Sequence, residues 1–164
     1  MTSAGISTSL VRLEGIRLAQ LVGELRDLLA SADARDEALN RLTPNPYPDD
    51  ANAAREFADG TRTDLLDRRG ADALTVHKAL AEFRIDGDEI SEEEALRVQD
   101  LVVAPQDVDA WLRTLNAIRL VIASRLEIDG EDDHDPDDPR YGVYDWLGYR
   151  LELLIQAAED AETR

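Results

Sequence analysis

The chain has 164 residues, and its 36 Asp and Glu against 18 Lys and Arg give a formal net charge of −18 at pH 7. This charge repels nucleic acid and anionic lipid headgroups, and the absence of cysteine excludes disulfides, zinc–thiolate sites and thiol nucleophiles. No apolar run reaches the roughly 20 residues of a membrane-spanning helix, and the sequence shows no signal-peptide pattern. We therefore expect a soluble, cytoplasmic protein with no nucleic-acid or membrane partner.

The length predicts a single domain over residues 1–164. Residues 1–8, rich in Ser and Thr, are expected to form a flexible N-terminus. Apolar residues then recur at helical spacing from Leu10 to Leu29, which predicts a helix with a polar outer face. Residues 33–42 predict a short second helix, and the three prolines within residues 44–48 predict a loop.

The next part of the chain contains two more predicted helices. One of the two aspartates at positions 49–50 caps the first helix, Gly60 ends it, and a threonine at position 61 or 63 caps the second, which extends to Phe83. Gly70 in the second helix has two interpretations. It either admits another backbone at close range or is a weak position that costs about 1 kcal/mol relative to Ala.

A short helix and a short apolar run follow. Ser91 and the three glutamates after it are typical of a helix N-terminus, and we expect this helix to end near Asp100. The apolar residues 101–103 are compatible with a brief strand, whose expected partner is the segment 7–11. Such a short run does not by itself distinguish a strand from other structure.

Two prolines open the helices expected at the centre of the fold. Pro105 begins a helix that is apolar on nearly all sides, which indicates burial, and that reaches about residue 128. Residues 129–138, with seven acids, predict a solvated linker, and Pro139 opens the last helix. The sequence thus predicts an all-α fold, a compact bundle of five or six helices. It does not decide whether a short two-stranded β ribbon is also present.

The sequence contains no well-formed catalytic or metal-binding motif. His134 lies among aspartates at 132, 133 and 135, but the adjacent Pro136 and the lack of an apolar anchor argue against a fixed metal site. His77 is interpreted as a partly buried structural histidine. No phosphate loop, dinucleotide motif or nucleophile elbow occurs. We predict no catalytic residue, no metal ligand and no cofactor, while an enzymatic activity is left open.

The candidate site residues lie on the two central helices. Asn116, Arg119 and Arg125 are polar groups among apolar neighbours and need partners, for which Asp145 or Glu152 is suitable. One interpretation is that these contacts fix the register of the two helices. The other is a pocket for an anionic ligand or for an acidic group of a partner. The full candidate set is Trp111, Asn116, Arg119, Arg125, Tyr144, Asp145, Trp146, Tyr149 and Glu152.

Two motifs on these helices resemble a known family. Residues 107–128 contain Ala-Trp, then Leu-Asn-x-x-Arg-Leu and a closing Leu, and residues 141–154 contain Val-Tyr-x-Trp-Leu followed by Glu-x-Leu. A weaker third match combines residues 46–50, 56–57 and 63–65. Through these motifs the chain resembles, over most of its length, an actinobacterial family of domains of unknown function, number twenty-seventeen in its series. The acidic linker and residues 1–8 diverge from it.

The resemblance implies a helical protein without an established catalytic activity. Genes of the family often lie near those of a Clp protease adaptor and of a sulfur-carrier route to cysteine, which implies a regulatory or protein-quality role. The charge and the absence of a catalytic constellation favour a non-enzymatic helical regulatory or adaptor protein that binds another protein through an acidic surface, with a homodimer left open. The alternative is a small-ligand binder or enzyme with a pocket between the two central helices. A third hypothesis is mimicry of nucleic acid by the acidic face.

Overall fold

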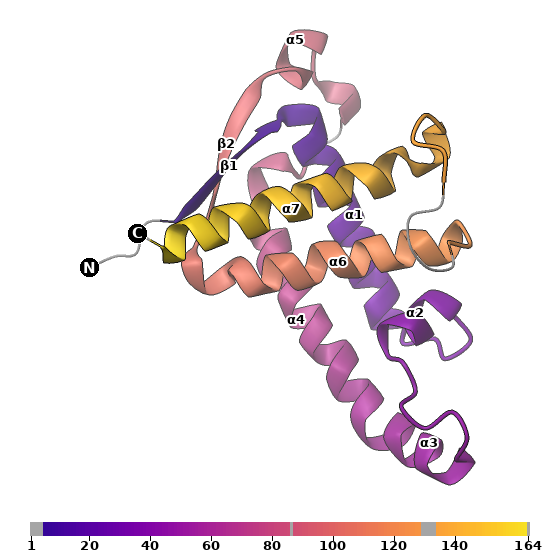
Figure 1. Cartoon of the computed structure of the whole chain (residues 1–164). Coiled ribbons are helices and arrows are strands. Elements are labelled where there is room, and N and C mark those ends of the chain that lie inside the picture. Colours follow the sequence, from indigo (N-terminus) through magenta and orange to yellow (C-terminus); the bar gives the residue numbers. More distant parts are fainter. Residues whose placement is uncertain (1–4, 86, 129–133, 164) are drawn as a thin grey trace.

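The computed structural model describes residues 5–85, 87–128 and 134–163. Its helices pack as a bundle with a two-stranded β ribbon along one side (Figure 1), which confirms the predicted fold class. In chain order the elements are β1 (Ile6–Val11), α1 (Arg12–Ser31), α2 (Glu37–Leu42), α3 (Ala51–Phe57), η1 (Ala58–Arg62), α4 (Thr63–Ala79), η2 (Ala81–Phe83), η3 (Gly87–Glu89), α5 (Glu92–Ala95), β2 (Val98–Val103), η4 (Pro105–Asp107), α6 (Val108–Arg125), η5 (Pro139–Tyr141) and α7 (Gly142–Glu162).

Helix α1 follows β1 without a loop. The carboxylate of Glu14 accepts a hydrogen bond from the backbone N–H of Val11 (3.0 Å), which satisfies one of the donors that a helix N-terminus leaves free. The predicted apolar stripe is buried against the rest of the bundle, and it includes Ile16, Leu18, Leu21, Val22, Leu25 and Leu29. The helix ends at Ala32, which takes the left-handed conformation with a φ of 48°.

The ribbon that the sequence left undecided is present as an antiparallel pair, with Ile6 opposite Val103 and Val11 opposite Val98. Strand β1 starts at Ile6, one residue before the expected segment 7–11, and β2 starts at Val98, three residues before the expected run 101–103. Residues 6–8 therefore belong to a strand and not to the expected flexible N-terminus. The expected helix up to Asp100 is wrong, since α5 ends at Ala95. Alternate residues of the ribbon are buried, and this period-two pattern explains why the segment is a strand.

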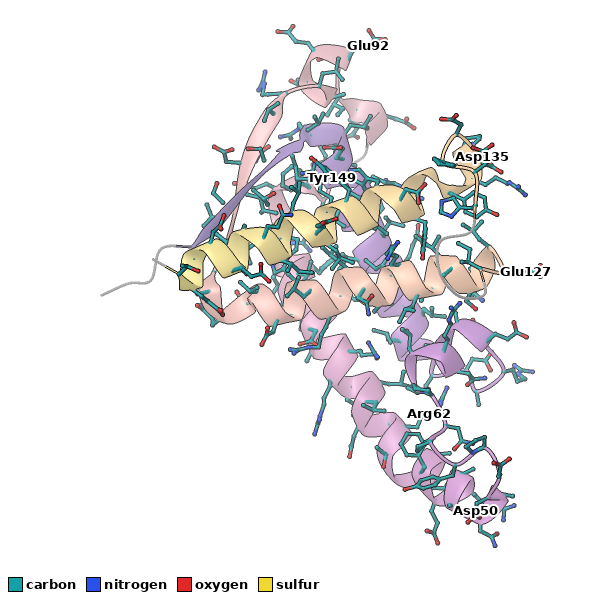
Figure 2. All side chains as sticks on the ribbon, viewed as in Figure 1. Asp50, Arg62, Glu92, Glu127, Asp135 and Tyr149 are labelled. Atoms are coloured by element: carbon teal, nitrogen blue, oxygen red, sulfur yellow. The ribbon has the colours of Figure 1, made fainter. Side chains whose placement is uncertain are left out.

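The chain stays helical where the sequence predicted a break. Asp50 caps α3 as expected, accepting hydrogen bonds from the N–H groups of Asn52 (3.1 Å) and Ala53 (3.0 Å). The predicted helix end at Gly60 is wrong, because the π-helical turn η1 joins α3 directly to α4. Glycine permits a helix end without requiring one. Helix α3 buries no residue and projects from the bundle, with Asp50 at its far end (Figure 2).

Helices α6 and α7 lie side by side across the bundle, and α6 also packs against α2 and α4 (Figure 1). Pro105 and Pro139 each open a 3₁₀ turn that leads into one of these helices, as predicted. Helix α6 ends at Arg125, somewhat before the expected residue 128, although Ile128 is still buried. Within the described ranges no helix combines the length and apolar character that a membrane span requires.

Two helical glycines have opposite surroundings. A Cβ atom at Gly15 in α1 would overlap the ring of Phe83, so the missing side chain lets η2 pack closely on α1. A Cβ atom at Gly70 in α4 would have no heavy atom within 4 Å. The structure therefore favours the weak-position interpretation of Gly70 over a close approach of another backbone.

We expect these glycines to respond oppositely to alanine. Gly70→Ala should raise the free energy of unfolding by about 0.4–1 kcal/mol, because alanine reduces the freedom of the unfolded chain and fits the helix. Gly15→Ala should lower it by about 1–3 kcal/mol through overpacking against Phe83. Urea unfolding of both variants, followed by circular dichroism, measures the two effects. Equal changes in both variants would contradict this account.

Candidate functional site

The predicted site residues fall into core positions, interhelical contacts and surface positions. Trp111 is 3% exposed and belongs to the main hydrophobic core. Tyr144 is buried in a smaller cluster with Ala123 and Ile128, at the end of α6. Trp111 therefore contributes to the main core, and Tyr144 packs α7 against the end of α6.

Arg119 on α6 is held by α7. Its guanidinium lies 4.1 Å from the centre of the Tyr144 ring, and its Nε donates to the backbone carbonyl of Tyr144 (3.4 Å). A Cβ atom at Gly148, one turn further along α7, would lie 3.1 Å from this guanidinium. The glycine thus makes room for the arginine, and the contact joins the two helices.

Arg125 has a different partner from those expected. Its guanidinium donates to the carboxylate of Asp36 (2.8 Å) at the start of α2, rather than to Asp145 or Glu152 on α7. The same carboxylate accepts from the backbone N–H of Ala38 (2.9 Å). The hydrogen bond from Arg125 is the largest of the effects that hold the pKa of Asp36 below its usual value. Arg125 therefore fixes α2 against α6.

Asp145 pairs with His134 from the segment before α7. Its carboxylate oxygens lie 2.8 and 3.0 Å from His134 Nε2, and the imidazole stacks on Tyr141 with ring centres 4.2 Å apart. His134, which belongs to the predicted acidic linker, is thus held against α7 and Tyr141. Residues 129–133 lie outside the described part of the chain.

Trp146 and Arg150 bind a residue that the sequence analysis did not single out. The carboxylate of Glu14 on α1 accepts from Trp146 Nε1 (2.9 Å) and from a terminal nitrogen of Arg150 (2.8 Å). Arg150 also donates to the backbone carbonyl of Ser9 in β1 (2.8 Å). Glu14 gives no signal in the sequence beyond its place in the first turn of α1, because the two side chains that it binds lie more than 130 residues away along the chain.

The remaining candidates line an open groove or face solvent. Asn116, Arg119 and Glu152 line a groove of about 740 Å³ between α6 and α7. Arg125 lines a second groove of about 430 Å³, which is bounded by α1, α6 and the start of α7. The walls of this second groove are mostly aliphatic. Tyr149 is 59% exposed and lines neither groove. The structure therefore distributes the predicted pocket residues over different surfaces.

A comparison of the sequence with models of protein families identifies the family of this chain. A family model described as a domain of unknown function, DUF2017, matches residues 1–158. The chain belongs to the DUF2017 family. No curated protein and no solved structure matches it.

The described residues of this DUF2017 protein hold no group of three or more His, Asp or Glu side chains placed to bind a metal ion. The suggested cluster around His134 involves Asp132 and Asp133, which lie outside those residues. His77 on α4 has Nδ1 3.3 Å from a terminal nitrogen of Arg26, an arrangement that suits an unprotonated acceptor. Burial, followed by the positive charges of Arg26 and Arg84, lowers the pKa of His77.

We expect Glu14→Gln to destabilise the protein. The amide keeps the shape of the carboxylate but loses its charge and one acceptor, so the free energy of unfolding should fall by about 1–3 kcal/mol. Glu24→Gln on the same helix is the matched control. Glu24 is exposed and lies 4.0 Å from Arg17, so its change should stay within about 0.5 kcal/mol. Urea unfolding measures the change in both variants. Equal changes would show that the contacts of Glu14 add no stability beyond the effect of losing one charge, and would contradict this prediction.

We expect His77 to reduce stability at mildly acidic pH. Because its folded pKa is below that of the unfolded chain, the unfolded state binds the proton more readily once the pH falls through about 6.5. The free energy of unfolding should therefore fall more between about pH 7.5 and 5.5 in the original chain than in His77→Gln. Urea titrations at both pH values measure this difference, and parallel losses in the two proteins would refute the linkage.

Proposed function

We propose that this DUF2017 chain is a cytoplasmic, non-enzymatic regulatory or adaptor protein that binds another protein through an acidic surface. The observation that carries the proposal is the state of the acids around α5. Glu89, Glu92, Glu93 and Glu94 are exposed, and none of them forms an ion pair within the described part of the chain. Glu92 points away from the body of the molecule (Figure 2).

The positive side chains support the same proposal, because many of them are engaged within the fold. Arg119, Arg125 and Arg150 bind groups on neighbouring elements. The excess of acids over bases is then presented outward, where it attracts a basic protein surface and repels nucleic acid.

A second candidate is the small-ligand function, which the groove between α6 and α7 favours. Arg113 and Arg119 line this groove, and guanidinium groups bind anionic ligands well. Arg113 already forms a salt bridge with Asp72 (2.7 Å), and Arg119 contacts Tyr144, so an anionic ligand has to compete with these contacts. We therefore place protein binding first.

We expect the immobilised full chain to retain basic proteins from a lysate of its own cells at low salt and to release them as salt rises, because added ions screen exposed charges. Mass spectrometry identifies the retained proteins. An unrelated protein of similar size and net charge is the control, and a retained set identical to that of the control would contradict the proposal. Thermal stabilisation of the chain by the small-molecule fraction alone would favour the second candidate.

A further inference from the structure

The two edges of the β ribbon are unequal. Residues of an antiparallel pair alternate between those whose backbone N–H and C=O face the neighbouring strand and those whose groups face away. The N–H of Arg12 donates to the carbonyl of Arg97 (2.9 Å), and in the observed register this places the backbone groups of Val98, Asp100 and Val102 on the outer edge of β2.

The outer edge of β1 is occupied. Arg150 from α7 donates to the carbonyl of Ser9 (2.8 Å), and Glu14 accepts from the N–H of Val11 (3.0 Å). Figure 1 shows the ribbon beside α7, with α5 at the end opposite the C-terminus. This edge therefore has no room for another strand.

The outer edge of β2 is open. No hydrogen bond from the described residues reaches the outward backbone groups of Val98, Asp100 or Val102. The aliphatic side chains on this strand and just before it are exposed as well, with 64% for Val98, 63% for Val102 and 70% for Leu96. Exposed backbone donors and acceptors beside exposed β-branched side chains are what an incoming strand requires.

We propose that a basic, extended segment of a partner protein pairs with β2 as a third, antiparallel strand of the ribbon. The proposal rests on the proposed function and names its surface and the class of its partner. The charge around β2 selects the partner, because residues 82–100 contain eight acids and two arginines. The exposed Glu92, Glu93 and Glu94 lie at the end of the ribbon where β2 begins.

The register defines the sequence of such a segment. Side chains opposite Val98, Asp100 and Val102 lie on the same face of the sheet as those residues. The carboxylate of Asp100 is held over the ribbon by Ser9 Oγ (2.7 Å), and a Lys or Arg opposite it forms a cross-strand charge pair. In the incoming segment, the residues two positions before and two positions after this Lys or Arg lie opposite Val102 and Val98, where apolar side chains fit. A further Lys or Arg on the C-terminal side of the motif reaches the glutamates of α5.

A second copy of this chain fits the same edge less well. Pairing two β2 strands about a twofold axis centred on Asp100 sets two carboxylates opposite each other, which destabilises a sheet. It also brings together two chains with a net charge of −18 each. Charge complementarity therefore favours a basic partner over self-association.

A library of random peptides displayed on phage, selected against the full chain, tests this proposal. We expect enrichment of apolar–x–Lys/Arg–x–apolar sequences followed by a basic residue. A synthetic peptide with the selected sequence should protect the amides of Val98, Asp100 and Val102 from hydrogen exchange. The amides of Gln99 and Leu101 already face β1 and should change little.

Two variants of the chain sharpen the test. Asp100→Lys should weaken binding of the selected peptide about tenfold or more, and a peptide with Glu in place of its central Lys or Arg should restore it. Val102→Pro removes an outward N–H without removing a hydrogen bond to β1, so it should also weaken binding about tenfold or more. Val102→Thr keeps the N–H and the branched side chain and should bind normally. Circular dichroism confirms that each variant is folded.

Selected peptides that protect other parts of the chain, or equal binding to the Val102→Pro and Val102→Thr variants, would overturn the proposal. Enrichment of no peptide, or a dimer that sedimentation detects and that Val102→Pro dissociates, would overturn it as well. If the Val102→Pro chain still retains basic proteins from the lysate in a salt-sensitive way, the strand-addition proposal fails and the proposed function stands. If neither chain retains them, both fail.

Discussion

The carboxylate of Glu14 connects three parts of the chain that are distant in sequence. It receives hydrogen bonds from the end of β1, through Val11, and from Trp146 and Arg150 on α7. A charged acceptor with several donors is among the stronger polar contacts in a protein. Because Arg150 also binds the carbonyl of Ser9, the same set of contacts fixes β1 against α7 and leaves β2 as the outer strand. The open edge of the ribbon is thus a consequence of how α7 docks.

Other arginine side chains donate hydrogen bonds to backbone carbonyl groups near the C-terminal ends of helices. Carbonyl groups at helix C-termini have no partner within the helix, and cations near them are favourable. Three arginines donate to carbonyl groups that lie just after a helix or at its end, namely Arg62 to Ala32 (3.2 Å), Arg69 to Leu42 (3.2 Å) and Arg41 to Ile128 (3.2 Å). These contacts join elements far apart in sequence, so the positive charges stabilise the fold while many acids face solvent.

The sequence predicts what local patterns determine. The apolar stripe of α1, the two prolines before α6 and α7, and the Asp50 cap each depend on residues within a few positions of one another, and all were confirmed. The sequence leaves the ribbon undecided, because a short apolar run such as residues 101–103 is compatible with a strand without requiring one. The start of β2 at Val98 was missed because the glutamates before it suggested a longer helix.

Contacts between side chains that are distant in sequence are not predictable from such local patterns. Arg125 needed an acid, but several acids satisfied that requirement in sequence, and only the packing of α2 on α6 selects Asp36. Glu14 and Arg150 likewise have no local signature, because their roles depend on the docking of α1 against α7. The candidate residues therefore lie in several separate contacts and surfaces of the fold, and the exposed strand edge became visible only from the burial and register of the ribbon.

An open strand edge is a hazard for most proteins, because it also pairs with further copies of the same chain. In natural proteins, charged residues on an edge strand disfavour such pairing, and Asp100 is a charged residue at the middle of β2. Its charge, with that of the glutamates on α5, opposes pairing with another −18 chain but favours a segment of opposite charge. Under the strand-addition proposal, the same acids oppose self-association and favour a basic segment, so the edge does not have to be covered by the fold itself.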